Sequence, residues 1–93
     1  MRIIGNIQHP HLKITVFKMD NKLSVKFESG LYEQTYKFRI SNTLATLEDV
    51  QKLVDVPFLQ AVEKELQRMH EIRNGALSGM NEETAEEEFP TII

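Results

Sequence analysis

Residues 22–28, KLSVKFE, alternate polar and apolar side chains without a break. Leu23, Val25 and Phe27 fall on one side of an extended chain, which is the pattern of a β-strand with a single buried face. Such a strand is not stable alone, because its apolar face and its two edges all need partners. The rest of the chain must therefore supply further strands of the same period and a layer that covers the apolar face.

Three pairs of turn-forming residues divide the first 40 residues into four such strands and set their register. The pairs are His9-Pro10, Asp20-Asn21 and Ser29-Gly30, whose residue types favour tight hairpin turns. Pro10 at the second corner position requires a cis peptide bond, unless the loop is wider and spans residues 8–11. In this register apolar residues face one another, as a true register requires. The predicted cross-strand pairs are Ile7 with Leu12, Ile3 with Val16, Val16 with Val25, Ile14 with Phe27, Phe27 with Tyr32, Leu23 with Tyr36, and Lys26 with Glu33.

The period of the apolar residues changes to that of a helix after residue 40. Thr46 and Asp49 resemble a capping box before a first helix. Asp55 as a cap, with Pro57 in the first turn, favours the start of a second helix. Asn74-Gly75 is the predicted end of that helix, because both residues accept the left-handed conformation. Gly5 lacks a side chain and leaves room on the sheet for a helix or a bulky neighbour. The sequence therefore predicts an α+β fold: a four-stranded antiparallel meander at about residues 2–8, 11–19, 22–29 and 31–40, with two helices at about 47–54 and 57–74 packed on one face.

The chain of 93 residues contains no cysteine and no apolar run of the roughly 20 residues that cross a membrane. We expect one domain at residues 1–77. Residues 78–93 are small, polar and acidic with an apolar end, contain no lysine or arginine, and predict a disordered tail. The first residues do not read as a signal peptide, so a cytoplasmic location and no membrane partner are expected. About 77 ordered residues without disulfides give a core worth only a few kcal/mol, which favours a homodimer.

No pattern in the sequence brings together side chains for catalysis or metal binding. There is no G-x-S-x-G elbow, no glycine-rich phosphate loop, and no nucleophile with a base nearby. His9 and His11 would point the same way in a strand, but a zinc site needs three or four ligands and His70 lies on the distant second helix. We therefore expect these two histidines to be loop residues, and we expect no enzymatic activity, catalytic residue, metal or cofactor.

The face of the sheet opposite the helices is predicted to be basic, with only two carboxylates, those of Glu28 and Glu33, among its cations. A basic face with an exposed aromatic ring binds single-stranded nucleic acid when the charges follow the backbone and the ring stacks on a base. Strands followed by a helix also resemble the layout of the Whirly and PUR-type single-strand binders, which implies the same class of ligand. The predicted surface for nucleic acid or another partner comprises Arg2, Lys13, Thr15, Phe17, Lys22, Lys26, Lys37 and Arg39.

The sequence leaves two other interpretations of this face open. Its lysines serve solubility alone, or Ile4, Phe17 and Met19 form a homodimer contact. The end of the tail, EEEFPTII, is similar to the acidic, apolar-ended tails of bacterial single-strand-binding proteins, which recruit partners; it can equally fold back on the basic face or serve solubility. Its predicted recognition element consists of Phe89, Ile92 and Ile93.

The function predicted from the sequence is a small, non-enzymatic interaction module that forms a homodimer. The alternative is a single-stranded DNA- or RNA-binding protein that uses the basic face and is modulated by the acidic tail.

Overall fold

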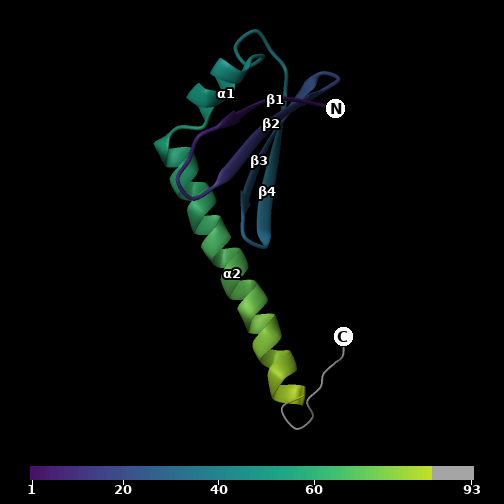
Figure 1. Ribbon diagram of the computed structural model, residues 1–93, viewed down its shortest axis with the longest axis vertical. Helices are drawn as coiled ribbons and strands as arrows, with labels where there is room; N and C mark the ends of the chain where they lie inside the picture. The colour runs from purple at the N-terminus through teal and green to yellow at the C-terminus, as the bar shows by residue number, and fades with distance from the viewer. Residues whose placement is uncertain (85–93) are drawn as a thin grey trace.

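The computed structural model describes the backbone of residues 1–84 and the side chains of residues 1–80. Four antiparallel strands form one sheet in the order β1-β2-β3-β4, and two helices follow them (Figure 1). The predicted α+β meander is therefore confirmed. The elements are β1 (Arg2–Ile7), β2 (Lys13–Met19), β3 (Lys22–Ser29), β4 (Tyr32–Arg39), α1 (Leu47–Leu53) and α2 (Val56–Thr84).

The hairpin of β2 and β3 has the predicted register. Val16 lies opposite Val25, and Ile14 lies opposite Phe27. Asp20, the first residue of the two-residue turn, takes a φ of 55°, a left-handed conformation that aspartate tolerates better than most residues. The four paired side chains are almost completely buried and form the centre of the core.

The turn between β3 and β4 lies one residue later than predicted, at Gly30-Leu31. Gly30 takes a φ of 59°, which is the conformation that a two-residue hairpin needs at its first central position and that glycine adopts without strain. Moving the turn by one residue shifts the cross-strand pairs by two, so the faces of β4 are as predicted although the pairs are not. The pairs found are Ser29 with Tyr32, Glu28 with Glu33, Phe27 with Gln34, Lys26 with Thr35, Val25 with Tyr36 and Leu23 with Phe38.

The first hairpin departs further from the prediction. Ile7 lies opposite Ile14 rather than Leu12, because a wide loop with trans peptide bonds replaces the tight His9-Pro10 turn. A β-bulge between Ile3 and Gly5 then shifts the register again. A bulge inserts one extra residue into a strand and reverses the faces of the residues beyond it.

The bulge changes which side chains reach the outer face. Ile3 pairs with Phe17 and is 59% exposed, whereas Ile4 packs against the core. Arg2 pairs with Lys18, and Lys18 pairs on its other side with the buried Leu23. Arg2 therefore lies on the face of the sheet that the helices cover. The sequence showed no signal of this bulge, because Ile3 and Ile4 are equally apolar.

The helices cover one face of the sheet, called here the inner face. Thr46 and Asp49 form the predicted capping box at the start of α1. Leu47 of α1 packs so closely on Gly5 that a Cβ atom there would meet its side chain, as expected from the missing side chain. Further along, the Phe58 ring of α2 stacks on Phe27 at a centroid distance of 5.6 Å.

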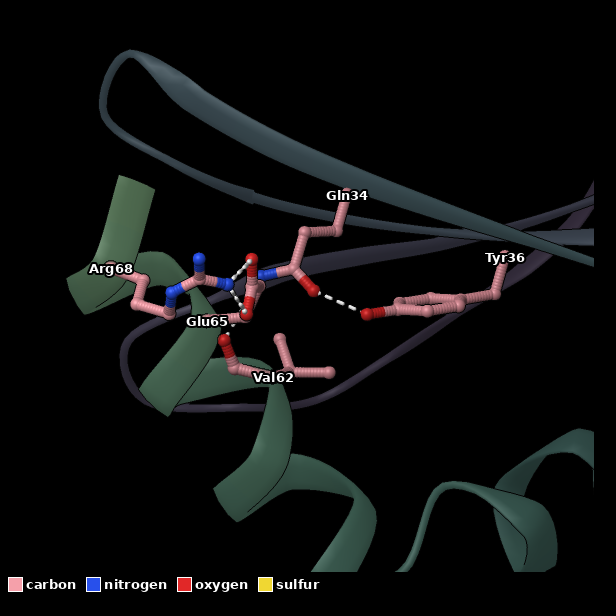
Figure 2. A network of polar contacts seen from close by, with 5 residues as sticks. All are labelled: Gln34, Tyr36, Val62, Glu65 and Arg68. Carbon is pink, nitrogen blue, oxygen red and sulfur yellow. Dashed lines mark hydrogen bonds and ion pairs between the residues drawn. The ribbon is translucent and has the colours of Figure 1, made fainter. Parts of the chain in front are cut away.

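A buried glutamine ties α2 to the sheet (Figure 2). The Gln34 amide donates a hydrogen bond from Nε2 to the Val62 carbonyl oxygen at 2.9 Å, and its Oε1 accepts one from the Tyr36 hydroxyl at 2.5 Å. Gln34 is only 9% exposed, so both its polar groups need these partners. The alternation of β4 predicted an inward-facing residue here, but not this polar contact with a helix.

Helix α2 is longer than predicted and continues through Asn74-Gly75 to Thr84. Neither of these two residues takes a positive φ. The Asn74 side chain instead contacts His70 Nε2 one turn earlier at 3.0 Å, and His70 Nδ1 lies 2.8 Å from the Tyr32 hydroxyl. Beyond His70, residues 71–80 are all exposed, and α2 projects past the end of the sheet (Figure 1).

The projecting helix makes the molecule elongated. Its extents are 59, 27 and 20 Å, and a helix of 29 residues is roughly 44 Å long. Within residues 1–84 no helix is long and apolar enough to span a membrane. Of the predicted disordered tail, residues 78–84 belong to α2. The remainder, with the predicted recognition element Phe89, Ile92 and Ile93, lies outside the described residues.

Candidate binding surface

The described elements leave the outer face of the sheet uncovered, because α1 and α2 both lie on the inner face (Figure 1). Alternation along each strand places the odd-numbered residues of β2 and β4 and the even-numbered residues of β3 on this outer face. The bulged β1 adds Ile3. The predicted surface residues found there are Lys13, Thr15, Phe17, Lys22, Lys26, Lys37 and Arg39, while Arg2 is not among them.

Three cations gather at one end of the outer face, near the turn between β2 and β3. Lys22 lies directly opposite Arg39, and Lys37 lies two residues before Arg39 on the same face. All three side chains are exposed, and none of them forms an ion pair with a described carboxylate. We call Lys22, Lys37 and Arg39 the basic cluster.

The carboxylates lie at the other end of the outer face. Glu33 lies directly opposite Glu28 and not, as predicted, opposite Lys26, because the turn lies one residue later than predicted. Glu28 also lies opposite Lys13 and has an oxygen 3.9 Å from Lys26 Nζ. Two cations at this end are therefore balanced by two carboxylates, which leaves the net positive charge at the basic cluster.

The aromatic ring in the middle of the face is less available than the sequence suggested. Phe17 is half-buried, and Lys26 Nζ lies 5.6 Å from the centre of its ring, within the range of a cation–π contact. Thr15 beside it is buried. The apolar patch of this face consists of Ile3, Phe17 and Met19, with Met19 47% exposed, because Ile4 has moved to the core side.

The histidines of the first loop have a structural arrangement. His9 Nδ1 accepts hydrogen bonds from the backbone N–H groups of His11 and Leu12 at 3.1 and 3.2 Å. The proton of the neutral ring must then be on Nε2, which lies 3.7 Å from a carboxylate oxygen of Glu63 on α2. His9 thereby closes the loop and joins it to the helix, a role that the spacing of His9 and His11 did not indicate.

Two shallow hollows lie elsewhere on the described surface. One is formed by a single face of α2, between Pro57 and Gln67, and the other by the loop around His9. Neither lining contains a serine, threonine or cysteine that could act as a nucleophile. No three described His, Asp or Glu side chains lie close enough to hold a metal ion together. The outer face and the edges of the sheet are therefore the candidate binding surfaces.

Comparisons with known proteins add no assignment to these surfaces: family models, curated proteins and solved structures all gave no match to the chain.

Proposed function

We propose that the chain is a non-enzymatic interaction module that works as a homodimer and presents the outer face of its sheet to a partner. The observation that carries the proposal is the placement of both helices on the inner face, which leaves a four-stranded surface with cations and exposed Ile3 and Met19 available for contact. A surface that combines apolar and cationic side chains is suited to binding another macromolecule.

The polar side chains near the helices support a binding role over catalysis. His9 bonds loop amides, His70 lies between Tyr32 and Asn74, and Gln34 bonds a helix carbonyl. His9 therefore shapes its own loop, and His70 and Gln34 join α2 to β4. A catalytic site instead needs polar groups that converge on a space for a substrate.

Sedimentation equilibrium of the full chain tests the homodimer. We expect a dimer at micromolar concentration, and a chain that stays monomeric at the highest soluble concentration would contradict the proposal. A Phe17→Glu variant tests the apolar patch, because a buried glutamate opposes any contact made through Ile3, Phe17 and Met19. Dimerisation that Phe17→Glu leaves unchanged would exclude the patch as the interface.

A second candidate, binding of single-stranded DNA or RNA, is favoured by the basic cluster. Lys22, Lys37 and Arg39 lie together without an opposing described carboxylate, and such a group of cations can follow a phosphate backbone. The partly covered ring of Phe17 weakens this candidate, because base stacking requires an open ring face. The two candidates differ in their response to salt, since binding to phosphates releases counterions.

A titration of labelled single-stranded oligonucleotides at two salt concentrations tests the second candidate. We expect binding that weakens with salt and weakens further in the double variant Lys22→Ala, Arg39→Ala; each lost phosphate contact lowers the log–log slope by roughly 0.7. The matched control is Lys52→Ala with Lys64→Ala, which removes two exposed cations from the helices. Removal of residues 85–93 should strengthen binding, because three glutamates are lost. No binding at about 50 µM and low salt, where even non-specific contacts register, would exclude this candidate.

A further inference from the structure

The two edges of the sheet differ in their capacity to pair with another strand. β1 is interrupted by the bulge between Ile3 and Gly5, and bulges are one of the ways in which proteins protect an edge. β4 pairs with β3 over all of its eight residues without a break. Along its other side, none of the elements in residues 1–84 pairs with it or covers it (Figure 1).

The hydrogen-bonding groups at this free edge can be identified residue by residue. Ser29 and Tyr32 flank the two-residue turn, and further along the same ladder Ile40 N–H donates to the Asn21 carbonyl at 2.8 Å. In an antiparallel pair the bonded positions alternate. The N–H and C=O groups of even-numbered residues in β4 therefore point to β3, and those of Glu33, Thr35 and Lys37 point to the free edge.

β4 lacks three of the features that prevent edge pairing, namely a proline, a bulge and an inward-facing charge. Its charged residues Glu33, Lys37 and Arg39 all lie on the outer face. The edge thus carries Lys37 and Arg39, which oppose pairing unless a partner strand supplies opposite charge. An edge of this length with unpaired backbone groups is a template for a further strand. The question is which strand fits it.

A second copy of β4 fits this edge with matching side chains. If two β4 strands run antiparallel with Thr35 opposite Thr35, then Glu33 of each copy lies opposite Lys37 of the other. These are positions whose backbone groups point to the free edge, so the hydrogen bonds and the charge pairs form in the same register. On the inner face the same register places Gln34 opposite Tyr36, and Tyr32 opposite Phe38.

The neighbouring registers match less well. If one strand moves by two residues in one direction, Lys37 lies opposite Thr35, and the remaining pair of opposite charges is Glu33 with Arg39. A shift in the other direction places Glu33 opposite Thr35 and Lys37 opposite the turn residue Leu31. The register centred on Thr35 is the one of these three that pairs both Glu33 and Lys37 with opposite charges.

We propose that two copies of this chain pair through the free edges of β4, about a two-fold axis at Thr35, to form one eight-stranded sheet. The inference rests on the proposed homodimer and names its contact surface. Pairing at the edge leaves the outer face of both copies open. Lys37 of the basic cluster is used in the pair with Glu33, whereas Lys22 and Arg39 of each copy stay available to a further partner. The apolar patch is then not needed for dimerisation.

Charge reversal at the paired positions tests the register. Glu33→Lys and Lys37→Glu each turn two attractive pairs into two repulsive ones, and each should raise the dimer dissociation constant by about tenfold or more. The double variant Glu33→Lys, Lys37→Glu restores opposite charges and should return to within about threefold of the wild type. Glu28→Lys is the matched control, because Glu28 lies directly opposite Glu33 on the same face but one strand away from the edge.

Mixing the two single variants gives a second measurement that does not depend on the double variant. Glu33→Lys in one chain faces Lys37→Glu in the other, so an equimolar mixture should form heterodimers at concentrations where each variant alone dimerises only weakly. A wild-type monomer would overturn both this inference and the homodimer. A wild-type dimer that both single reversals leave intact, or single reversals that neither the double variant nor the mixture rescues, would overturn the edge pairing alone.

Discussion

The close contact between Gly5 and Leu47 gives the sharpest test of how α1 is seated on the sheet. A Cβ atom at Gly5 would overlap Leu47 Cδ2 and would lie 3.1 Å from Cδ1 and 3.3 Å from Cγ. Carbon atoms in good contact are roughly 3.5–4.0 Å apart, so Leu47 would have to withdraw by roughly 1 Å. Rotation about the Leu47 Cβ–Cγ bond moves the two methyl groups but not Cγ. Because Cγ is also too close, this rotation alone does not provide the space.

We expect Gly5→Ala to lower the free energy of unfolding by about 1–2 kcal/mol. Overpacking of a filled site costs about 1–3 kcal/mol, and the loss of glycine from a strand returns about 0.5–1 kcal/mol through the unfolded chain. Urea denaturation followed by circular dichroism measures the difference, with the slope of the transition as a check that unfolding stays two-state.

A double-mutant cycle identifies the cause of this loss. Leu47→Ala removes the side chain that the new methyl group would meet, so the second substitution should cost less in the Gly5→Ala background than in the wild type. We expect a coupling energy of about 1 kcal/mol. Additive effects, or a Gly5→Ala variant as stable as the wild type, would refute the claim that α1 depends on the missing side chain.

Three further substitutions test other parts of the fold. Gly30→Ala should cost about 1 kcal/mol, measured by thermal unfolding, because its φ of 59° places a side chain in the left-handed region. Gln34→Leu should lower the free energy of unfolding by about 1–3 kcal/mol, since both of its hydrogen-bond partners lose their contact. The backbone N–H groups of Ala45 and Thr46 hold the pKa of Asp49 below its ordinary 3.8, so its stabilisation is complete above that value and is lost as the pH falls through the lowered pKa. Asp49→Asn should therefore flatten the decline of the thermal midpoint at acidic pH, and an unchanged decline would exclude this role.

The alternation of residues 22–28 predicted the buried side chains of β3 correctly, because successive side chains of a strand point to opposite faces. The turns were less reliable. Ser29-Gly30 and Gly30-Leu31 preserve the same faces, so the hydrophobic pattern cannot distinguish them, and the conformation of one glycine decides. The bulge at Ile4 also escaped prediction, since two adjacent isoleucines give no indication of which one is buried.

The candidate surface was predicted in part. Five of the six predicted cations follow from strand alternation and lie on the outer face, namely Lys13, Lys22, Lys26, Lys37 and Arg39. Arg2 and Ile4 do not lie there, because they lie within or beyond the bulge. The predicted end of α2 was wrong, because Asn74-Gly75 ends a helix only where one of these residues takes the left-handed conformation. The free edge of β4 needs the observed order of the strands and the direction of their hydrogen bonds, which single-strand patterns do not contain.

Amide hydrogen exchange along β4 tests the central claim most directly, at a concentration where sedimentation finds a dimer. The amides of Gln34 and Tyr36 are directed to β3 and should be protected in monomer and dimer alike. The amides of Glu33, Thr35 and Lys37 should be protected only in the dimer and should lose protection on dilution or in the Glu33→Lys variant. Rapid exchange of these three amides in the wild-type dimer, with Gln34 and Tyr36 still protected, would contradict pairing through the β4 edge.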